Sequence, residues 1–437
     1  MARSSPGGRA ARRLLRSRRR PRRKARAADR RLLANIQFSF VQRGARQLPA
    51  SLLLRTRERP RSVERIGAVA LTQEALYTEL DLDLSWSERA LPERERTKHV
   101  HRLHPYHGKF IPQLVEALLS EYVPRGRILD PFAGSGTTLV QALESRLDAT
   151  GVELAAFNCL LIRVKTAQYD LFALERELRD VLGRLEPDSE RTGNEYLRTW
   201  YAPQALAELL HFRSLIPEYE HGDVLRVILS RAARSARRTT HFDLEAPRVP
   251  QLEPYWCHKH RRECRPVETA RQFLSRYTLD TLARIKEFSR VRARTRSAVV
   301  LHGDARTVGY DARFDGIVTS PPYPGLIDYH EQHRYAYELL GLDDRRELEL
   351  GAAARGTSRS ALEEYRAGIA ASLARAAVAI KPRAPLCIVV NDRRDLYPEI
   401  LERAGLRLER RHTRHVNRRT GRRAGEYFED VLVARFR

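Results

Sequence analysis

A strand–helix–strand pattern between Gly126 and Glu153 constrains the fold more than any other stretch of the chain. The apolar run GRILD, 126–130, is followed by a glycine-containing turn, by TTLVQALESR with helical spacing, and by the short run ATGVE, 149–153. Two strands joined through one helix form a βαβ unit, in which the strands are parallel and the crossover is right-handed. We therefore expect an α/β protein built on a parallel sheet.

Later apolar runs extend this sheet. SAVVLHGD (297–304), FDGIVTS (314–320) and PLCIVVND (385–392) have the composition of buried strands, and a long helical segment, 361–380, separates the last two. The alternating runs 407–416 and 427–436 flank a turn through Asn417 to Gly425, which predicts an antiparallel pair. The expected fold is Rossmann-like: a mostly parallel sheet with an antiparallel C-terminal strand, covered by helices.

Composition and periodicity divide the chain into three regions. Residues 96–170 and 297–437 carry the sheet, whereas 171–296 form a mostly helical insertion that is a candidate for target recognition. Residues 1–95 begin with an arm rich in Arg, in which Asp29 is the single acid among the first 31 residues. This arm is expected to be partly disordered, and either binds phosphates nonspecifically or is a solvated tail.

The overall charge favours an anionic partner. Lys and Arg number 80 against 55 Asp and Glu, and only 7 of the 80 are Lys. Such a basic chain is attracted to polyanions, with nucleic acid the first candidate, although an Arg-rich coding bias would also raise the charge. The sequence has no apolar run of membrane-spanning length, no signal peptide and only four scattered cysteines, so we expect a cytoplasmic protein in a reducing compartment.

The turn LDPFAGSGTTLV, 129–140, joins the first strand to its helix through Gly134 and Gly136. Glycines there allow positive φ and the close approach of a ligand to the helix N-terminus. A phosphate-binding P-loop requires Lys before the Ser or Thr, and here Thr137 follows Gly136 directly. Glu153 ends the second strand, where nucleoside-binding sheets place an acid for ribose hydroxyls. A nucleoside ligand is favoured, with a purely structural turn as the alternative.

The stretch TSPPY, 319–323, stops the strand FDGIV with two prolines, which lack an N–H and fix φ. Taken alone, it has the composition of an ordinary turn. Together, DPFAGSGTT and TSPPY resemble the amino-group DNA methyltransferases, which transfer methyl from S-adenosylmethionine to an exocyclic base nitrogen. The resemblance covers about 101–170 and 297–437, and HPYHGKFIPQL, 104–114, is similar to the segment that helps cover the cofactor in that family.

The resemblance implies a methyltransferase-type sheet, S-adenosylmethionine as cofactor and double-stranded DNA as partner. No metal is needed for the transfer. The residues implied in cofactor binding are Phe110, Asp130, Phe132, Gly134, Ser135, Gly136, Thr137, Glu153 and Asp304. In the family pattern Gly134 to Thr137 pass beneath the amino-acid part of the cofactor and Asp304 meets the adenine ring; as an alternative, Asp304 is an ordinary cap after a strand.

The same resemblance implies catalytic roles for Ser320, Pro321, Pro322 and Tyr323. The exocyclic amine is a poor nucleophile because its lone pair is conjugated with the ring. The Ser320 side chain and the Pro321 carbonyl would accept the two amine hydrogens and aim the lone pair at the methyl group, while the prolines stiffen the turn. Tyr323 would stack on a base flipped out of the duplex.

Ser at the first position of the tetrapeptide usually accompanies cytosine-N4 methylation in this family, so N4 of cytosine is the expected target, with a cognate restriction endonuclease as a candidate partner. Adenine-N6 methylation is the near alternative. RNA base methylation, or nucleic-acid binding by a chain with a decayed site, are more distant ones. The helical insertion precedes the strand SAVVLH, which departs from the family pattern, so no known target-recognition region transfers to it.

Four further candidates lie outside the catalytic motifs. Cys257, His260 and Cys264 have the spacing of three zinc ligands, with His258 or His241 as a fourth; the alternative is a packed loop with two buried cysteines. The Arg-rich run 231–241 is a candidate for contact with the DNA backbone, or a solvated face. The segment 330–337 is expected to line the base pocket or to pack as a helix, and the polar segment 343–360 to close over DNA.

Overall fold

The computed structural model describes residues 91, 95, 97–106, 108, 110–186, 192–239, 249–257, 260–416 and 428–436. The basic N-terminal arm, the turn Asn417 to Gly425, His241 and His258 lie outside the described residues. The described residues belong to one compact unit.

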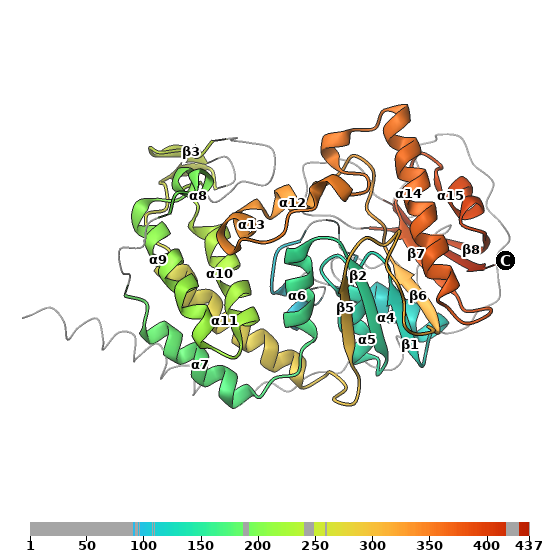
Figure 1. Cartoon of the computed structure of the whole chain (residues 1–437), viewed down its shortest axis with the longest axis horizontal. Coiled ribbons are helices and arrows are strands. Elements are labelled where there is room, and N and C mark those ends of the chain that lie inside the picture. Colours follow the sequence, from blue (N-terminus) through green and yellow to red (C-terminus); the bar gives the residue numbers. More distant parts are fainter. Residues whose placement is uncertain are drawn as a thin grey trace, which may run out of the picture. The chain divides into compact units, whose positions relative to one another are not determined.

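Seven strands form one sheet in the order β5-β2-β1-β6-β7-β9-β8 (Figure 1). Neighbouring strands are parallel from β5 to β7, and β9 is antiparallel to both β7 and β8. This confirms the expected Rossmann-like sheet with an antiparallel strand at the C-terminal end. The strands are β1 (Arg127–Asp130), β2 (Asp148–Glu153), β5 (Ala298–His302), β6 (Gly316–Thr319), β7 (Leu386–Val390), β8 (Leu406–His415) and β9 (Phe428–Phe436).

The strand order reverses between β1 and β6. From β1 the chain builds outward through β2 to β5, and then returns to the other side of β1 with β6 and β7. In open α/β sheets the loops on the two sides of such a reversal separate at the carboxyl ends of the strands and leave a crevice for ligands. The glycine turn follows β1 and the TSPPY turn begins at the end of β6, so the topology brings the two motifs to one crevice.

Helices cover both faces of the sheet. The helices that alternate with its strands are η3 (His99–Arg102), α4 (Pro112–Tyr122), α5 (Thr137–Glu144), α6 (Ala156–Thr166), α12 (Tyr329–Gln332), α13 (Arg334–Leu340), η5 (Arg346–Leu348), η6 (Ala353–Arg355), α14 (Arg359–Val378) and α15 (Tyr397–Arg403). Strand β7 shows the consequence: Ile388 belongs to the apolar cluster beneath α14 and α15, and its neighbour Val389 to the cluster beneath α4 and α5. Because both faces are covered, β7 is apolar at every position.

Strand β5 departs from the expectation of a buried strand. It forms hydrogen bonds only with β2 among the described strands and lies at the edge of the sheet, where Val299 is 52% exposed. An edge strand and a central strand of a parallel sheet can have the same apolar composition, so the sequence pattern did not distinguish them.

The segment between β2 and β5 folds into helices and one small hairpin. The helices are α7 (Leu171–Gly183), α8 (Glu195–Trp200), α9 (Pro203–Leu215), η4 (Ile216–Glu218), α10 (Gly222–Ala236) and α11 (Arg271–Ser289), and the hairpin pairs β3 (Tyr255–Cys257) with β4 (Arg262–Cys264). The apolar side chains of these helices share one apolar cluster with Phe157 of α6 and Tyr335 of α13. The inserted helices therefore pack directly on the elements that flank the crevice.

Two arginines of the run 231–241, Arg231 and Arg237, are buried and do not form a solvated basic face. Arg231 is only 6% exposed; it donates to Thr281 at 2.6 Å and to Asp280 at 2.5 Å, and its guanidinium lies 4.4 Å from the ring centroid of Tyr277. Arg237 is 8% exposed and lies over the ring of Tyr335. These two arginines hold α10 against its neighbours, so the expectation of phosphate contact is wrong for them.

Among the described residues, no helix has both the length and the apolar character needed to span a membrane.

Candidate active site

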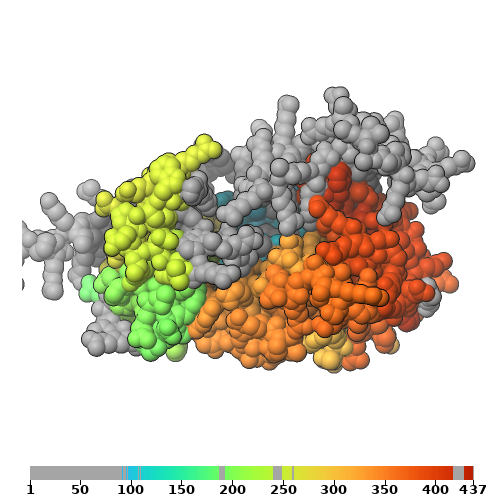
Figure 2. Space-filling view, turned by 90° about the horizontal axis from the view of Figure 1, so that it is seen from above, coloured from blue at the N-terminus to red at the C-terminus, as the bar shows by residue number. Residues whose placement is uncertain are grey.

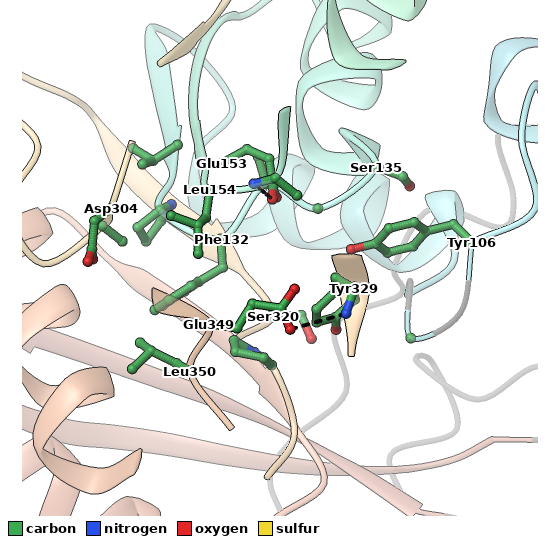
Figure 3. Close-up of a pocket in the computed structure, with 18 of the residues that line it drawn as sticks. Tyr106, Phe132, Ser135, Glu153, Leu154, Asp304, Ser320, Tyr329, Glu349 and Leu350 are labelled. Atoms are coloured by element: carbon green, nitrogen blue, oxygen red, sulfur yellow. Dashed lines mark hydrogen bonds between the residues drawn. The ribbon is translucent and has the colours of Figure 1, made fainter. Parts of the chain in front are cut away.

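A pocket of about 840 Å³, partly open to solvent, lies at the carboxyl ends of β1, β2, β5 and β6 (Figure 3). Seven of the nine predicted cofactor residues line it, and so do two of the four predicted catalytic residues. The lining residues are Tyr106, Gly108, Phe110, Pro131, Phe132, Ala133, Gly134, Ser135, Thr137, Val152, Glu153, Leu154, Ala155, Gly303, Asp304, Ala305, Ser320, Pro322, Tyr329, His330, Leu348, Glu349 and Leu350. The glycine turn and the TSPPY turn thus meet in one cavity.

Both glycines of the turn have positive φ, and a Cβ at each would meet a different neighbour. Gly134 has φ +52°, and a Cβ there would lie 3.0 Å from the Tyr106 hydroxyl oxygen. Gly136 is the N-cap of α5 with φ +82°, and a Cβ there would lie 2.8 Å from Cγ1 of Ile162. Positive φ is strained for other residues, so the turn depends on glycine. Gly136 does not line the pocket but sets the start of the helix behind it.

Ser135 gives the turn its polar character. The Nζ of buried Lys165 donates to the Ser135 carbonyl at 2.6 Å and fixes the turn from behind. Ser135 lines the pocket, and its hydroxyl is buried with no hydrogen-bond partner among the described residues. A buried hydroxyl without a partner is costly, and a polar ligand group in the pocket would satisfy it.

Asp130 lies behind the pocket and not in its wall. Its Oδ1 accepts from the Thr319 hydroxyl at 2.6 Å and from the Phe132 N–H at 3.1 Å. Burial raises the pKa of Asp130 to about 6, against the opposing effect of these hydrogen bonds. Because Asp130 ends β1 and Thr319 ends β6, this carboxyl group connects the glycine turn to the TSPPY turn.

Two carboxylates line the pocket at the ends of β2 and β5. Glu153 accepts from the Ala155 N–H at 2.8 Å, and burial raises its pKa to about 7. Asp304 accepts from the Arg306 backbone N–H and from its guanidinium Nε, each at 2.9 Å. Asp304 therefore has both expected positions: its carboxylate caps the backbone after β5, and the residue lines the pocket.

The TSPPY turn divides between the pocket and its surroundings. Ser320 and Pro322 line the pocket, whereas buried Pro321 and half-buried Tyr323 do not. The Tyr323 hydroxyl donates to Glu429 of β9 at 3.5 Å. The Tyr365 hydroxyl of α14 donates to the Pro322 carbonyl at 2.9 Å, and a second hydroxyl, that of Tyr397, lies 3.1 Å from Tyr365. The turn is thus held by α14 on the side away from Ser320.

The sequence motifs missed the side of the pocket formed by Leu348, Glu349 and Leu350. Glu349 is buried, accepts from the His330 N–H at 2.8 Å and is paired with the ring Nδ1 of His330. The ring Nε2 of His330 accepts from the Arg345 N–H at 3.2 Å, so Nδ1 carries the proton and donates to Glu349. Part of the polar segment 343–360 thus lines this pocket, and its expected closure over DNA stays a prediction.

Two tyrosines, Tyr106 and Tyr329, also line the pocket. The rings of Tyr106 and Tyr329 stack with centroids 5.6 Å apart, and the Tyr106 hydroxyl accepts from the Asn158 amide at 3.4 Å. Burial raises the pKa of Tyr106 well above its ordinary value, so it stays a neutral hydroxyl. Of the segment 330–337, His330 lines the pocket, while His333 packs its ring against Phe157 and Tyr106. The segment therefore contributes both to helix packing and to the pocket wall, and a role in binding the base stays a prediction.

Outside the pocket, Cys257, His260 and Cys264 come together at the β3–β4 hairpin. Each offers one ligand atom, and these atoms all lie within 4.8 Å of one another. The three candidate zinc ligands are thus neighbours in space as well as in sequence.

The chain is similar to curated proteins over most of its length. It is 36% identical to the Type II methyltransferase M.MjaII of Methanocaldococcus jannaschii over an alignment of 449 residues, which covers 82% of this chain and 84% of that protein. It is 22% identical to the Type II methyltransferase M.MvaI of Kocuria varians, over 51% of this chain and 53% of that protein. No family model matches the sequence.

Solved structures give weaker likenesses. TrmN from Thermus thermophilus is 13% identical with a TM-score of 0.28, covering 76% of this chain and 50% of that one. The rRNA methyltransferase aviRa from Streptomyces viridochromogenes is 13% identical with a TM-score of 0.29, covering 76% and 88%.

The extent of the likeness to M.MjaII confirms the family that the two turn motifs indicated, and with it the cofactor. The chain belongs to the Type II methyltransferases, which are S-adenosylmethionine-dependent DNA methyltransferases.

Proposed function

We propose that the protein methylates the exocyclic N4 of cytosine in double-stranded DNA. The observation that carries the proposal is that Ser320 lines the same pocket as the glycine turn and Glu153. An amine held at Ser320 therefore lies beside the cofactor. The serine in the first position of the tetrapeptide favours cytosine over adenine, as the resemblance implies. We also propose that the inserted helices contribute to sequence recognition, that the enzyme is cytoplasmic, and that a cognate restriction endonuclease accompanies it.

The pocket fits S-adenosylmethionine, which supplies an activated methyl group when bound. The partnerless Ser135 hydroxyl and the turn at Gly134 suit the charged amino-acid end. Glu153 suits the ribose hydroxyls, because a carboxylate accepts two hydrogen bonds. Asp304 offers an acceptor for the adenine amino group, and the apolar side chains of Phe132 and Leu350 line the same pocket (Figure 3). Gly136 and Asp130 act from behind the wall by fixing the turn.

The TSPPY turn is proposed to orient the target amine. The Ser320 hydroxyl and the Pro321 carbonyl accept its two hydrogens, which localises the nitrogen lone pair and directs it toward the cofactor side of the pocket. A preformed acceptor pair costs no reorganisation during the reaction, and the prolines together with Tyr365 keep the turn rigid. Tyr323, half-buried beside the pocket, is proposed to stack on the flipped base.

Cofactor binding is expected to depend on the ionisation of Glu153. Its raised pKa of about 7 means that it is largely protonated below that pH and becomes a carboxylate as the pH rises. If only the carboxylate form binds the ribose, the Kd for S-adenosylmethionine is about tenfold weaker at about pH 6 than at about pH 8. Titration calorimetry measures this. Glu153→Gln should bind weakly with a flat profile; an unchanged slope in that variant contradicts the role of Glu153.

Removing the Tyr365 hydroxyl tests the support of the turn. Tyr365→Phe is expected to lower kcat about three- to tenfold, the effect of one neutral hydrogen bond, with the KM for S-adenosylmethionine unchanged. The matched control is Tyr397→Phe, because the Tyr397 hydroxyl contacts that of Tyr365, which is the one that donates to the Pro322 carbonyl. Its kcat should fall less. Equal losses in kcat for the two variants, or a loss confined to KM, would show that Tyr365 acts through the stability of the core.

The nature of the acceptor is tested with a labelled methyl group. The purified chain is incubated with labelled S-adenosylmethionine and, in separate reactions, with unmethylated duplex DNA, single-stranded DNA and ribosomal RNA. The proposal predicts label in duplex DNA, with methylcytosine as the labelled nucleoside. Label in RNA alone would favour the RNA base methyltransferase, and N6-methyladenine in DNA would keep the mechanism and change the base.

A further inference from the structure

The β3–β4 hairpin is too small to be stable through apolar packing. Each strand has three residues, and no residue of either strand belongs to the three apolar clusters of the described chain. Trp256 on β3 is 59% exposed. Isolated two-stranded hairpins are marginally stable in water, so something other than a core must hold this one together.

The hairpin brings soft ligands to one point. Cys257 ends β3, Cys264 ends β4, and His260 lies in the turn between them. Their ligand atoms lie within 4.8 Å of one another, and the Nδ1 of His260 is 3.4 Å from the Sγ of Cys264. In a tetrahedral zinc site, with Zn–S near 2.3 Å and Zn–N near 2.05 Å, the edge between sulfur and nitrogen is about 3.6 Å. The observed separation is therefore close to that of two ligands on one ion.

The side chains around the cluster are polar. Arg261, Arg262 and Arg265 are exposed next to it. The structure contains no disulfide between the described cysteines, Cys159, Cys257, Cys264 and Cys387. Zinc prefers thiolate and imidazole ligands, whereas metals such as Mg²⁺ and Ca²⁺ prefer oxygen ligands.

We propose that Cys257, His260 and Cys264 bind a zinc ion that stabilises the β3–β4 hairpin. None of the three lines the pocket, so the ion is structural and separate from methyl transfer. Figure 2 shows the yellow segment that contains the hairpin at the molecular surface. Because binding energy at such a site is folding energy, the ion supplies the stability that the missing apolar contacts do not.

The test is the metal content of the full chain, purified with a thiol reductant from cells supplied with zinc. We expect about one zinc per chain in the wild type and less than about a fifth of that in Cys257→Ser and Cys264→Ser. Cys387→Ala is the matched control, since Cys387 is a buried cysteine of β7 far from the cluster in sequence, and it should keep its zinc. Circular dichroism and cofactor binding establish that each variant is folded.

A second readout identifies the ligands. The apo chain loaded with Co²⁺ should show thiolate-to-metal charge-transfer absorption that is lost in the two serine variants, and His260→Ala should alter its d–d bands. Chelation should also speed tryptic cleavage at Arg261 in the turn and at Arg262, the first residue of β4. Absence of stoichiometric metal from the wild type, full zinc content in both serine variants, or a Cys257–Cys264 disulfide in the reduced preparation would overturn the proposal.

Discussion

Ser320→Ala is expected to lower the single-turnover rate of methyl transfer by about 10² to 10³, the effect of removing one positioned group that acts in the transition state. The Kd for S-adenosylmethionine should change less than about threefold, because the proposed cofactor contacts come from the glycine turn, Glu153 and Asp304. Rapid quench with labelled cofactor measures the rate, and calorimetry measures the affinity.

The matched control for this substitution is Ser289→Ala, since the Ser289 hydroxyl donates only to the Ile285 carbonyl within α11. Its rate and affinity should equal those of the wild type. If Ser320→Ala lost cofactor affinity as strongly as rate, Ser320 would belong to the cofactor site and not to the acceptor of the amine.

Gly136→Val should abolish cofactor binding, with the Kd weakened about 100-fold or more. Valine cannot adopt the φ of +82° without strain, and its Cβ would lie 2.8 Å from Ile162, so the start of α5 and the glycine turn must both shift. A displaced turn no longer presents Gly134 and Ser135 to the ligand. Calorimetry gives the Kd, and thermal unfolding shows whether the variant remains folded.

Two further substitutions distinguish an effect on the glycine turn from a general loss of stability. Gly309→Ala is the control, because no atom lies within 4 Å of a Cβ at that position. Gly136→Ala, which carries the same φ strain with a smaller side chain, should weaken binding less than Gly136→Val does. A folded Gly136→Val that bound S-adenosylmethionine normally would contradict the role of the turn.

The parts of the site that were predictable are those encoded locally. Gly134 and Ser320 each lie at the end of an apolar strand in a short stretch whose composition requires a turn, and the βαβ pattern fixes which sheet edge both occupy. Glu153 was predictable for the same reason, because it ends the strand next to β1.

The remaining parts depend on contacts between distant segments. Glu349 lies in a polar stretch without periodicity, and only its pairing with His330 brings it to the pocket. Arg231 has the sequence context of a surface arginine, yet Asp280, 49 residues later, makes its burial favourable. Strands β3 and β4 are too short to show an alternating pattern, so the Cys and His spacing was the only signal for the hairpin.

The identity of the methylated base is the most direct test of whether this protein methylates N4 of cytosine. The wild-type chain is incubated with unmethylated genomic DNA and S-adenosylmethionine with an isotopically labelled methyl group, the DNA is digested to nucleosides, and the labelled nucleoside is identified by mass spectrometry. We expect N4-methylcytosine as the labelled nucleoside in the reaction with the wild type. At the same reaction time it should be absent from the reaction with Ser320→Ala. N6-methyladenine as the labelled product, or no labelled nucleoside from a preparation shown to bind cofactor, would contradict this expectation.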